Sequence, residues 1–398
     1  PSALVPPPAD IVYVAVLNHG IERSDEWACL RQLPGQGGLS SAALNSGFLQ
    51  LSLPGATLKW ERHSEFSRYT LVLPASGGPG PGLAWLRTIP GRTVAAIRLT
   101  LQVGDIAPPD AAMEAARAHF EQPPLIASLM GQGHSLVVTN FHLGDDGFER
   151  LHVVVPAGTT ATRAGRISAR LLELETYRLM ALRGLPVAKA LAPVLGEAER
   201  ALADIMAQLE GKLERDETLL DTLVRLAARV ERATAEHMFR FAATRAYAAI
   251  VGQRIDELRE QRVPGAQTIG EFMRRRLSPA IATVEATARR LASLSERIER
   301  AGALLRTRVD IAAESHSRQL LERLNRGQSL QLKLQSTVEG LSIAAISYYV
   351  VSLILYAGKA AKQAGWPLEP EIVAGSSIPA VVLAVAWLSR RIHRRLVH

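Results

Sequence analysis

Two carboxylates and an imidazole occur at alternate positions of one short stretch, as Glu61, His63 and Glu65. Alternate side chains of an extended strand point to the same face, so a strand here places all three groups together, with Lys59 beside them. Carboxylate and imidazole groups can hold a divalent cation, and they can also bind a basic partner. Because three residues spread along one strand do not converge on an ion without help from elsewhere, a solvated strand face with local charge pairs is the alternative.

Further ligands for such an ion could come from a second polar stretch, which contains His142, Asp145 and Asp146. The sequence Asp145-Asp146-Gly147 is also an ordinary turn signal between strands. The candidate metal site therefore consists of Glu61, His63 and Glu65 with a divalent cation. No other cofactor is expected.

Patterns typical of other enzymes are missing from the sequence. The chain has a single cysteine, Cys29, which excludes an internal disulfide framework and a multi-cysteine metal site. It contains no Gly-Lys-Ser/Thr phosphate loop, no Gly-x-Ser-x-Gly motif and no His-Glu-x-x-His motif. A non-enzymatic protein is therefore the preferred interpretation.

The residues before Pro156 predict a cytoplasmic α+β domain, residues 1–156. Short runs rich in β-branched and aromatic residues alternate there with clusters of Pro and Gly. Two helices are expected among them, Asp25–Gln32 and Pro109–Glu121. The predicted strands are Ile11–Leu17, Phe48–Leu53, Tyr69–Leu73, Val94–Val103, Leu136–Thr139 and Leu151–Val155.

Helical periodicity dominates residues 157–340. In the later part of this region, apolar residues recur in alternating steps of three and four, as in a coiled coil. A long antiparallel, coiled-coil-like helical stalk is expected, packed within one chain or on copies of itself. The predicted helices run from Thr160 to a stop at Gly184-Leu185-Pro186, from Asp216 to Arg262, and from Thr268 or Ser278 toward the membrane.

Two uncharged apolar runs follow, Leu341–Gly358 and Ile372–Leu388. Each has about 17 or 18 residues, just enough to cross a hydrocarbon core of roughly 30 Å as a helix. Aromatic residues gather near the ends of the runs, as is typical of the headgroup layer. We predict that residues 341–398 form a two-helix transmembrane hairpin with a basic tail. A pair of buried core helices is the alternative.

Four arginines after the second run orient this hairpin: Arg390, Arg391, Arg394 and Arg395. The positive-inside rule places the tail in the cytoplasm. Two spans and the lack of an export signal at the amino end place the other terminus there too. The expected location is a bacterial inner membrane, whose anionic headgroups attract the tail. Since lipid explains much of the net charge of +8, nucleic acid is not expected to bind.

Five segments carry a family resemblance. The most specific is Leu58–Thr70, which contains Trp60-Glu61-Arg62-His63, and the others are Phe141–Phe148, Gly165–Met180, Phe241–Tyr247 and Ser336–Ser342. Together they resemble a bacterial family of uncharacterised membrane-anchored proteins, catalogued as domain of unknown function 3422. The resemblance covers nearly the whole chain and implies an anchor but no catalytic residues. Relatives carry an acidic-His-Ala-Arg-Pro motif near the amino end that this sequence lacks.

A second resemblance, in layout only, is to CorA-type magnesium channels. Tyr356-Ala357-Gly358-Lys359 stands where those channels carry Gly-Met-Asn, and a lysine there would repel divalent cations. We therefore expect an interaction or scaffold protein anchored in the inner membrane, with an unknown cytoplasmic protein partner. The alternatives are a homo-oligomeric CorA-like channel or transporter, and a metal-binding sensor or enzyme that uses Glu61, His63 and Glu65.

Overall fold

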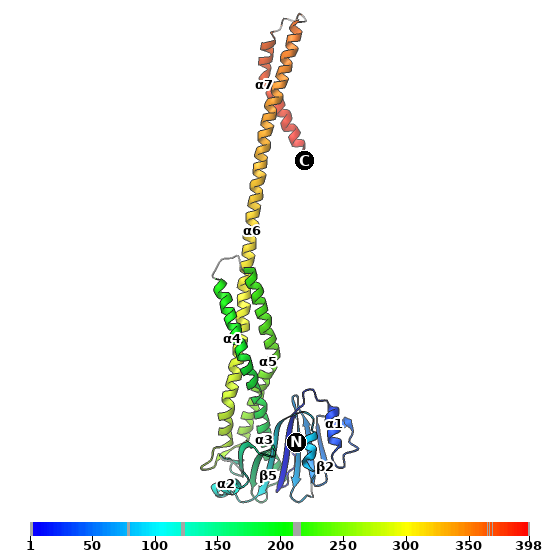
Figure 1. Cartoon of the computed structure of the whole chain (residues 1–398), viewed down its shortest axis with the longest axis vertical. Helices are drawn as coiled ribbons and strands as arrows, with labels where there is room; N and C mark the ends of the chain where they lie inside the picture. Colours follow the sequence, from blue (N-terminus) through cyan, green and yellow to red (C-terminus); the bar gives the residue numbers. More distant parts are fainter. Residues whose placement is uncertain are drawn as a thin grey trace. The chain divides into compact units, whose positions relative to one another are not determined.

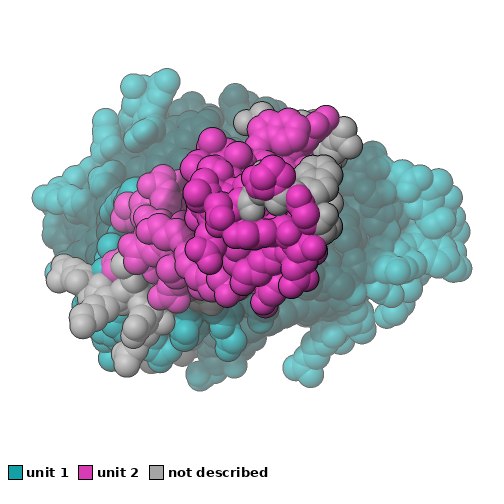
Figure 2. Space-filling model, turned by 90° about the horizontal axis from the view of Figure 1, so that it is seen from above, with its two compact units in different colours: residues 1–212, 218–303 teal, residues 213–217, 304–398 magenta. Residues whose placement is uncertain are grey.

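The computed structural model describes residues 3–77, 80–120, 124–209, 216–363, 365, 367 and 369–396. The chain divides into two compact units, which Figure 2 shows in different colours. Unit 1 comprises residues 1–212 and 218–303, and unit 2 comprises residues 213–217 and 304–398. Unit 1 contains a sheet with helices packed on it, whereas the described part of unit 2 consists largely of two helices.

Unit 1 is built on one sheet of nine strands, in the order β2-β3-β4-β1-β5-β8-β7-β6-β9. Neighbouring strands are antiparallel except for β5 and β8, whose parallel pairing requires a crossover connection. The mixed α+β class is confirmed. The strands are β1 (Ala9–Leu17), β2 (Phe48–Leu53), β3 (Ala56–Arg62), β4 (Phe66–Pro74), β5 (Arg92–Val103), β6 (Ile126–Met130), β7 (Ser135–Leu143), β8 (Glu149–Val155) and β9 (Gln261–Arg262).

Two of the helices begin at residues that favour a helix start, a capping threonine and a proline. The Thr160 hydroxyl accepts a hydrogen bond from the Arg163 amide at the start of α3, and Pro109 is the first residue of α2. Figure 1 shows their arrangement within unit 1. The helices are α1 (Arg23–Arg31), α2 (Pro109–Arg117), α3 (Ala161–Leu182), α4 (Gly184–Leu209), α5 (Asp216–Leu258), α6 (Ile269–Gln363) and α7 (Pro370–Leu396), with short 3-10 turns η1 (Ser41–Leu44) and η2 (Leu83–Thr88).

Both faces of the sheet are covered by helices. On one face Ile11 and Tyr13 of β1 pack in a core with residues of α3, α5 and the first part of α6. On the other face Val12 and Val14 pack in a core that includes α1. A strand buried on both sides reads as a continuous apolar run, which is why β1 shows no alternation of apolar and polar residues.

The six strands predicted from the sequence fall within β1, β2, β4, β5, β7 and β8. One helix was missed, because the sequence Gly184-Leu185-Pro186 predicts a stop. The helical chain instead resumes at once as α4. Pro186 lies in the first turn of this helix, where its missing N–H would have no intrahelical partner in any case.

The later helices of unit 1 pack together as a bundle. Arg229 of α5 pairs with Glu197 of α4 at 2.7 Å, and Arg290 of α6 pairs with Glu199 at 2.8 Å. Buried apolar residues from all three helices lie between them, including Leu195 and Leu226. The three-four alternation in the sequence thus corresponds to helix faces buried within unit 1.

In unit 2, α7 runs back along the last part of α6 (Figure 1). Near the turn, a Cβ added at Gly358 would lie 3.3 Å from Cα of Pro370, so the two backbones approach closely. At the other end, the Ser389 hydroxyl donates to Oε1 of Glu339 at 3.0 Å. The two contacts define a helical hairpin between residues 339–358 and 370–389.

Candidate functional site

Strand β3 is shorter than the predicted strand. It ends at Arg62, and residues 63–65 form the connection to β4. A strand continuing to Glu65 was therefore wrong, because the chain reverses there to pair β3 with β4. Up to Arg62 the expected alternation holds. Trp60 lies in the core that includes α1, and Glu61 points toward α3.

Glu61 is held by two cations in a chain of ion pairs. Its carboxylate lies 3.1 Å from Lys59 and 2.6 Å from Arg68. Arg68 also pairs with Glu173 of α3 at 3.0 Å, and Glu173 pairs with Arg254 of α5 at 2.8 Å. Burial alone would raise the pKa of Glu61, but the hydrogen bond and the charge of Arg68 outweigh it and lower this pKa. We call Lys59, Glu61, Arg68, Glu173 and Arg254 the Arg68 network.

His63 lies beside the Arg68 network and does not join it. Its ring stacks on Phe66 with centroids 4.7 Å apart, and Nε2 is buried without a hydrogen-bond partner among the described residues. Burial lowers the pKa of His63, and the positive charge of Arg68 lowers it further. The imidazole is therefore neutral at pH 7.

Glu65 contacts Arg183, which directly follows α3, and two residues of α5, Arg240 and Tyr247. It pairs with Arg240, lies 3.6 Å from Arg183, and accepts a hydrogen bond of 3.4 Å from the Tyr247 hydroxyl. Burial, together with the charge of Glu65, raises the pKa of Tyr247 to about 12. His63 and Glu65 line a cavity of about 890 Å³ whose other lining residues include Arg62, Arg92, Arg183 and Arg240.

The three predicted ligands, Glu61, His63 and Glu65, are thus close in sequence but contact different groups of the protein. Glu61 and Glu65 are paired with arginines, and His63 lies against an aromatic ring. In the described ranges, no three His, Cys, Asp or Glu side chains are grouped so that they could hold a metal ion. A cation bound here would have to displace guanidinium groups from both carboxylates.

The second polar stretch does not supply the missing ligands. His142 lies at the end of β7, and Asp145 and Asp146 lie in the turn between β7 and β8. In the sheet, the strands β4, β1, β5 and β8 separate β3 from β7. Asp146 pairs loosely with Arg98 and Arg150, at 3.7 and 3.6 Å. Asp145-Asp146-Gly147 forms the turn that its sequence indicates, with the Gly147 amide donating to the Gly144 carbonyl.

One buried acidic cluster was missed by sequence reasoning. Glu175 of α3 is 1 % exposed, and Arg178 donates to both of its carboxylate oxygens. Glu149 of β8 is 7 % exposed, and burial raises its pKa to about 9, aided by the charge of Glu175 and a hydrogen bond with it. The one available signal was Glu175 itself, a carboxylate among the apolar positions Leu171, Leu172 and Leu174.

The described chain has three helical stretches that are long and apolar enough to cross a membrane. One of them, residues 161–209, contributes Leu171 and Leu172 to the core of unit 1. The other two lie in α6 and α7, and only 6 % of each apolar window is buried. Their large apolar side chains are exposed, for example Leu353, Leu383 and Trp387.

A family model described as "Protein of unknown function (DUF3422)" matches residues 1–396. The chain therefore belongs to the DUF3422 family. Comparison with curated proteins finds no match. Four of the five segments that carry the family resemblance lie in unit 1, and three of them hold residues of the Arg68 network or of the Glu65 contacts. In this DUF3422 chain Glu61 of the Trp60-Glu61-Arg62-His63 stretch is linked to α3 and α5 through Arg68, Glu173 and Arg254.

The predicted membrane-orienting arginines lie at the end of α7. The guanidinium of Arg391 lies 5.0 Å from the ring centroid of Trp387. The side chains of Arg390, Arg394 and Arg395 lie outside the described residues. The helix continues through all four positions, so they follow the apolar run without a break.

Proposed function

We propose that this protein is anchored in a bacterial inner membrane by α6 and α7, and that unit 1 acts in the cytoplasm as an interaction or scaffold module. The observation that carries the proposal is the exposure of uncharged apolar side chains along both helices of unit 2. Leu341 and Leu383 are each more than 70 % exposed, and neither run contains Asp, Glu, Lys or Arg. Soluble proteins rarely leave so large an apolar surface in water.

The dimensions of the hairpin support a membrane span. Its two pairing contacts, Glu339 with Ser389 and Gly358 with Pro370, bracket the apolar runs. The stretch Pro370–Ser389 has 20 residues. At a rise of 1.5 Å per residue it would measure roughly 30 Å, which is about the thickness of a hydrocarbon core.

Polar groups of the hairpin also suit this location. The hydroxyls of Ser342 and Ser352 donate to backbone carbonyls of their own helix, at 2.8 Å each, so these two exposed hydroxyls would not face lipid as unsatisfied donors. The Ser347 hydroxyl is buried and has no hydrogen-bond partner among the described residues. Beyond the apolar runs, Lys362 and Glu369 pair at 2.9 Å near the turn. Charged groups thus lie at the turn and in the basic tail, where headgroups and water would receive them.

Membrane extraction tests the proposal with the full chain expressed in bacteria. The protein should stay in the pelleted membranes after alkaline carbonate treatment. Replacing Leu353 and Leu383 by Asp should release it, because one aspartate in a span costs about 2.5 to 3.5 kcal/mol. The matched control replaces the exposed Leu320 and Leu332 of α6, outside the apolar runs, by Asp, and should stay in the membrane. Wild-type protein in the soluble fraction would refute the anchor.

An oligomeric channel or transporter is the second candidate function, and one observation favours it. Residues 313–338 of α6 are all exposed, although they include Leu320, Leu324 and Leu334. These three leucines are 49 to 67 % exposed, and further copies of the chain could cover them. The mass of the full chain in detergent separates the two functions, because a monomer excludes a ring of subunits around a pore.

A further inference from the structure

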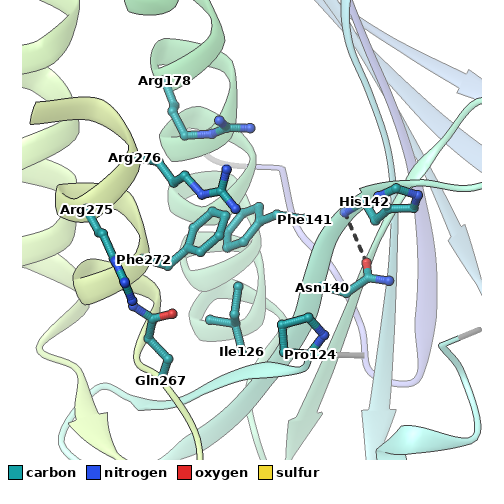
Figure 3. A pocket seen from close by; sticks show the side chains of 10 residues that line it. All are labelled: Pro124, Ile126, Asn140, Phe141, His142, Arg178, Gln267, Phe272, Arg275 and Arg276. Atoms are coloured by element: carbon teal, nitrogen blue, oxygen red, sulfur yellow. Dashed lines mark hydrogen bonds between the residues drawn. The ribbon is translucent and has the colours of Figure 1, made fainter. Parts of the chain in front are cut away.

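A cavity of about 770 Å³ in unit 1 lies where the end of β7 meets the first turns of α6 (Figure 3). β7 contributes Phe141 to its lining, α3 contributes Arg178, and α6 contributes Phe272, Arg275 and Arg276. The volume is in the range of pockets that hold small organic ligands. None of its lining residues belongs to the Arg68 network or to unit 2.

Two parallel rings form the aromatic part of the cavity wall. Phe141 and Phe272 stack with centroids 4.6 Å apart and planes 5° from parallel. Phe141 has a φ of 47°, uncommon for a bulky residue, and it lies in an irregular stretch between Thr139 and Leu143 where the pairing of β7 with β8 shifts. Bulges of this kind redirect side chains, and here the Phe141 ring meets Phe272 of α6, while β7 continues to Leu143.

The charge around the cavity is strongly positive. Arg178 is already held by Glu175. Arg275 and Arg276 are exposed, and neither forms an ion pair within the described residues. The guanidinium of Arg276 lies 5.6 Å from the ring centroid of Phe272, so it is positioned above the aromatic wall. No lining residue is a carboxylate, and although Glu175 competes for Arg178, an anion would be attracted to Arg275 and Arg276.

The amino end of α6 is not itself the anion site, because its first amides have partners inside the protein. The Ile269 amide donates to the Ser128 hydroxyl at 2.9 Å, and the Gly270 amide donates to the Glu260 carboxylate. The Glu271 amide donates to the Thr268 hydroxyl at 3.1 Å. An anion in the cavity would therefore be bound by side chains.

We propose that this cavity binds a small organic phosphate that carries a flat ring, of the nucleoside diphosphate class. Each guanidinium presents a fork of N–H donors, and several forks around one cavity suit the many oxygens of a phosphate better than a single carboxylate. Phe141 and Phe272 stack on each other, and Arg178 and Arg276 lie over them at 5.8 and 5.6 Å from the ring centroids. A flat ring would therefore meet the edges of this aromatic pair, beside the buried side chain of Ile126. The side-chain amide of Gln267 also lines the cavity and can bond to polar atoms on the edge of such a ring.

Calorimetric titration of the full chain in detergent tests the proposal, with ADP, GDP, CDP, UDP and pyrophosphate as probes at one fixed salt concentration. At least one nucleoside diphosphate should bind more tightly than pyrophosphate, because only the nucleotide has a ring. Arg275→Ala and Arg276→Ala should each weaken that nucleotide about tenfold, the value of one charge-assisted hydrogen bond. Phe272→Leu should weaken the nucleotide and leave pyrophosphate binding unchanged.

Arg274→Ala is the matched control. It removes the same charge from the same turn of α6, and Arg274 does not line the cavity. Its effect should stay within about twofold, as for an ordinary surface substitution. Equal losses in all three arginine variants would show general charge attraction and overturn the site. Binding of none of the probes would overturn it too, and so would pyrophosphate binding as tight as that of every nucleotide.

Discussion

A guanidinium nitrogen of Arg62 lies 2.5 Å from Oε2 of Glu26, a carboxylate with no exposed surface. The second terminal nitrogen of Arg62 donates to the Ile21 carbonyl at 2.8 Å. One side chain thus ties β3 to α1 and to the residues before it. A buried carboxylate is retained at such a position only when a cation and hydrogen bonds compensate its lost hydration.

Arg62→Ala should therefore destabilise unit 1 by about 3 to 5 kcal/mol, because it leaves the Glu26 carboxylate buried without its cation. The thermal midpoint of the full chain in detergent, followed by tryptophan fluorescence, measures the loss. The double variant Arg62→Met with Glu26→Met should recover most of it, since neither charge then remains buried.

Arg31→Ala is the control for this prediction. Arg31 lies on α1, is exposed, and donates only to the Gly37 carbonyl among its side-chain hydrogen bonds in the described chain. Its loss should cost no more than about 0.5 kcal/mol. An Arg62→Ala protein as stable as Arg31→Ala would show that Glu26 needs no cation.

Glu149 gives the stability of unit 1 a dependence on pH. Because burial raises its pKa to about 9, the folded protein keeps a proton that the unfolded chain loses near pH 4.5. The folded state thus binds more protons between these values, and stability falls as pH rises from about 4.5 toward 9. Glu149→Gln mimics the protonated form and should raise the free energy of unfolding at pH 8 by at least roughly 1.4 kcal/mol, the value of one pKa unit. A higher thermal midpoint at pH 8 would report this increase.

The two proteins should become equally stable only at a pH well below 4.5, where Glu149 is protonated in both the folded and the unfolded state. Glu114→Gln on α2 is the control, because Glu114 is exposed and pairs only with Arg117 among the described ion pairs. It should leave the pH profile unchanged. A Glu149→Gln protein that is less stable than wild type at pH 8 would contradict a neutral Glu149.

Most strands and the α+β class were predictable because local pattern dictates them. β1 contains the continuous apolar run Ile11–Leu17, β8 ends in three valines, and turns such as Asp145-Asp146-Gly147 separate the strands. The ion pairs that tie Arg68 and Glu65 to the helices were not predictable, since Glu173 lies 105 residues from Arg68 and Arg240 lies 175 residues from Glu65 in the sequence. Periodicity reports which face of an element is buried, but it does not report which charged residue of another element meets that face.

The stacking of Phe141 on Phe272 could not be predicted from the sequence for a related reason. The Phe141–Phe148 segment stood out in the sequence, yet the positive φ of Phe141 arises from an irregularity in the β7 and β8 pairing. Such an irregularity depends on the register of two strands and on the helix that receives the side chain. It therefore belongs to the tertiary structure, and no pattern local to residues 139–143 indicates it.

The last prediction concerns the orientation of the proposed hairpin. A reporter enzyme that requires the cytoplasm should be active when it is fused after His398. A reporter enzyme that requires export should be active when it is inserted at Gln363, the last residue of α6. Replacing Arg390, Arg391, Arg394 and Arg395 by Ser should scramble this preference, because positive charge close to a span sets orientation. Activity of the two reporters in the opposite compartments would reverse the topology.

The control for this prediction removes four arginines that lie farther from the apolar runs. Arg297, Arg300, Arg306 and Arg308 precede Leu341 by more than thirty residues, beyond the range of about 15 to 20 residues over which loop charge acts. Their replacement by Ser changes net charge by the same amount and should leave both reporters as in the wild type. If this variant scrambles the orientation as strongly as the tail variant, then total charge sets the topology and the tail has no special role.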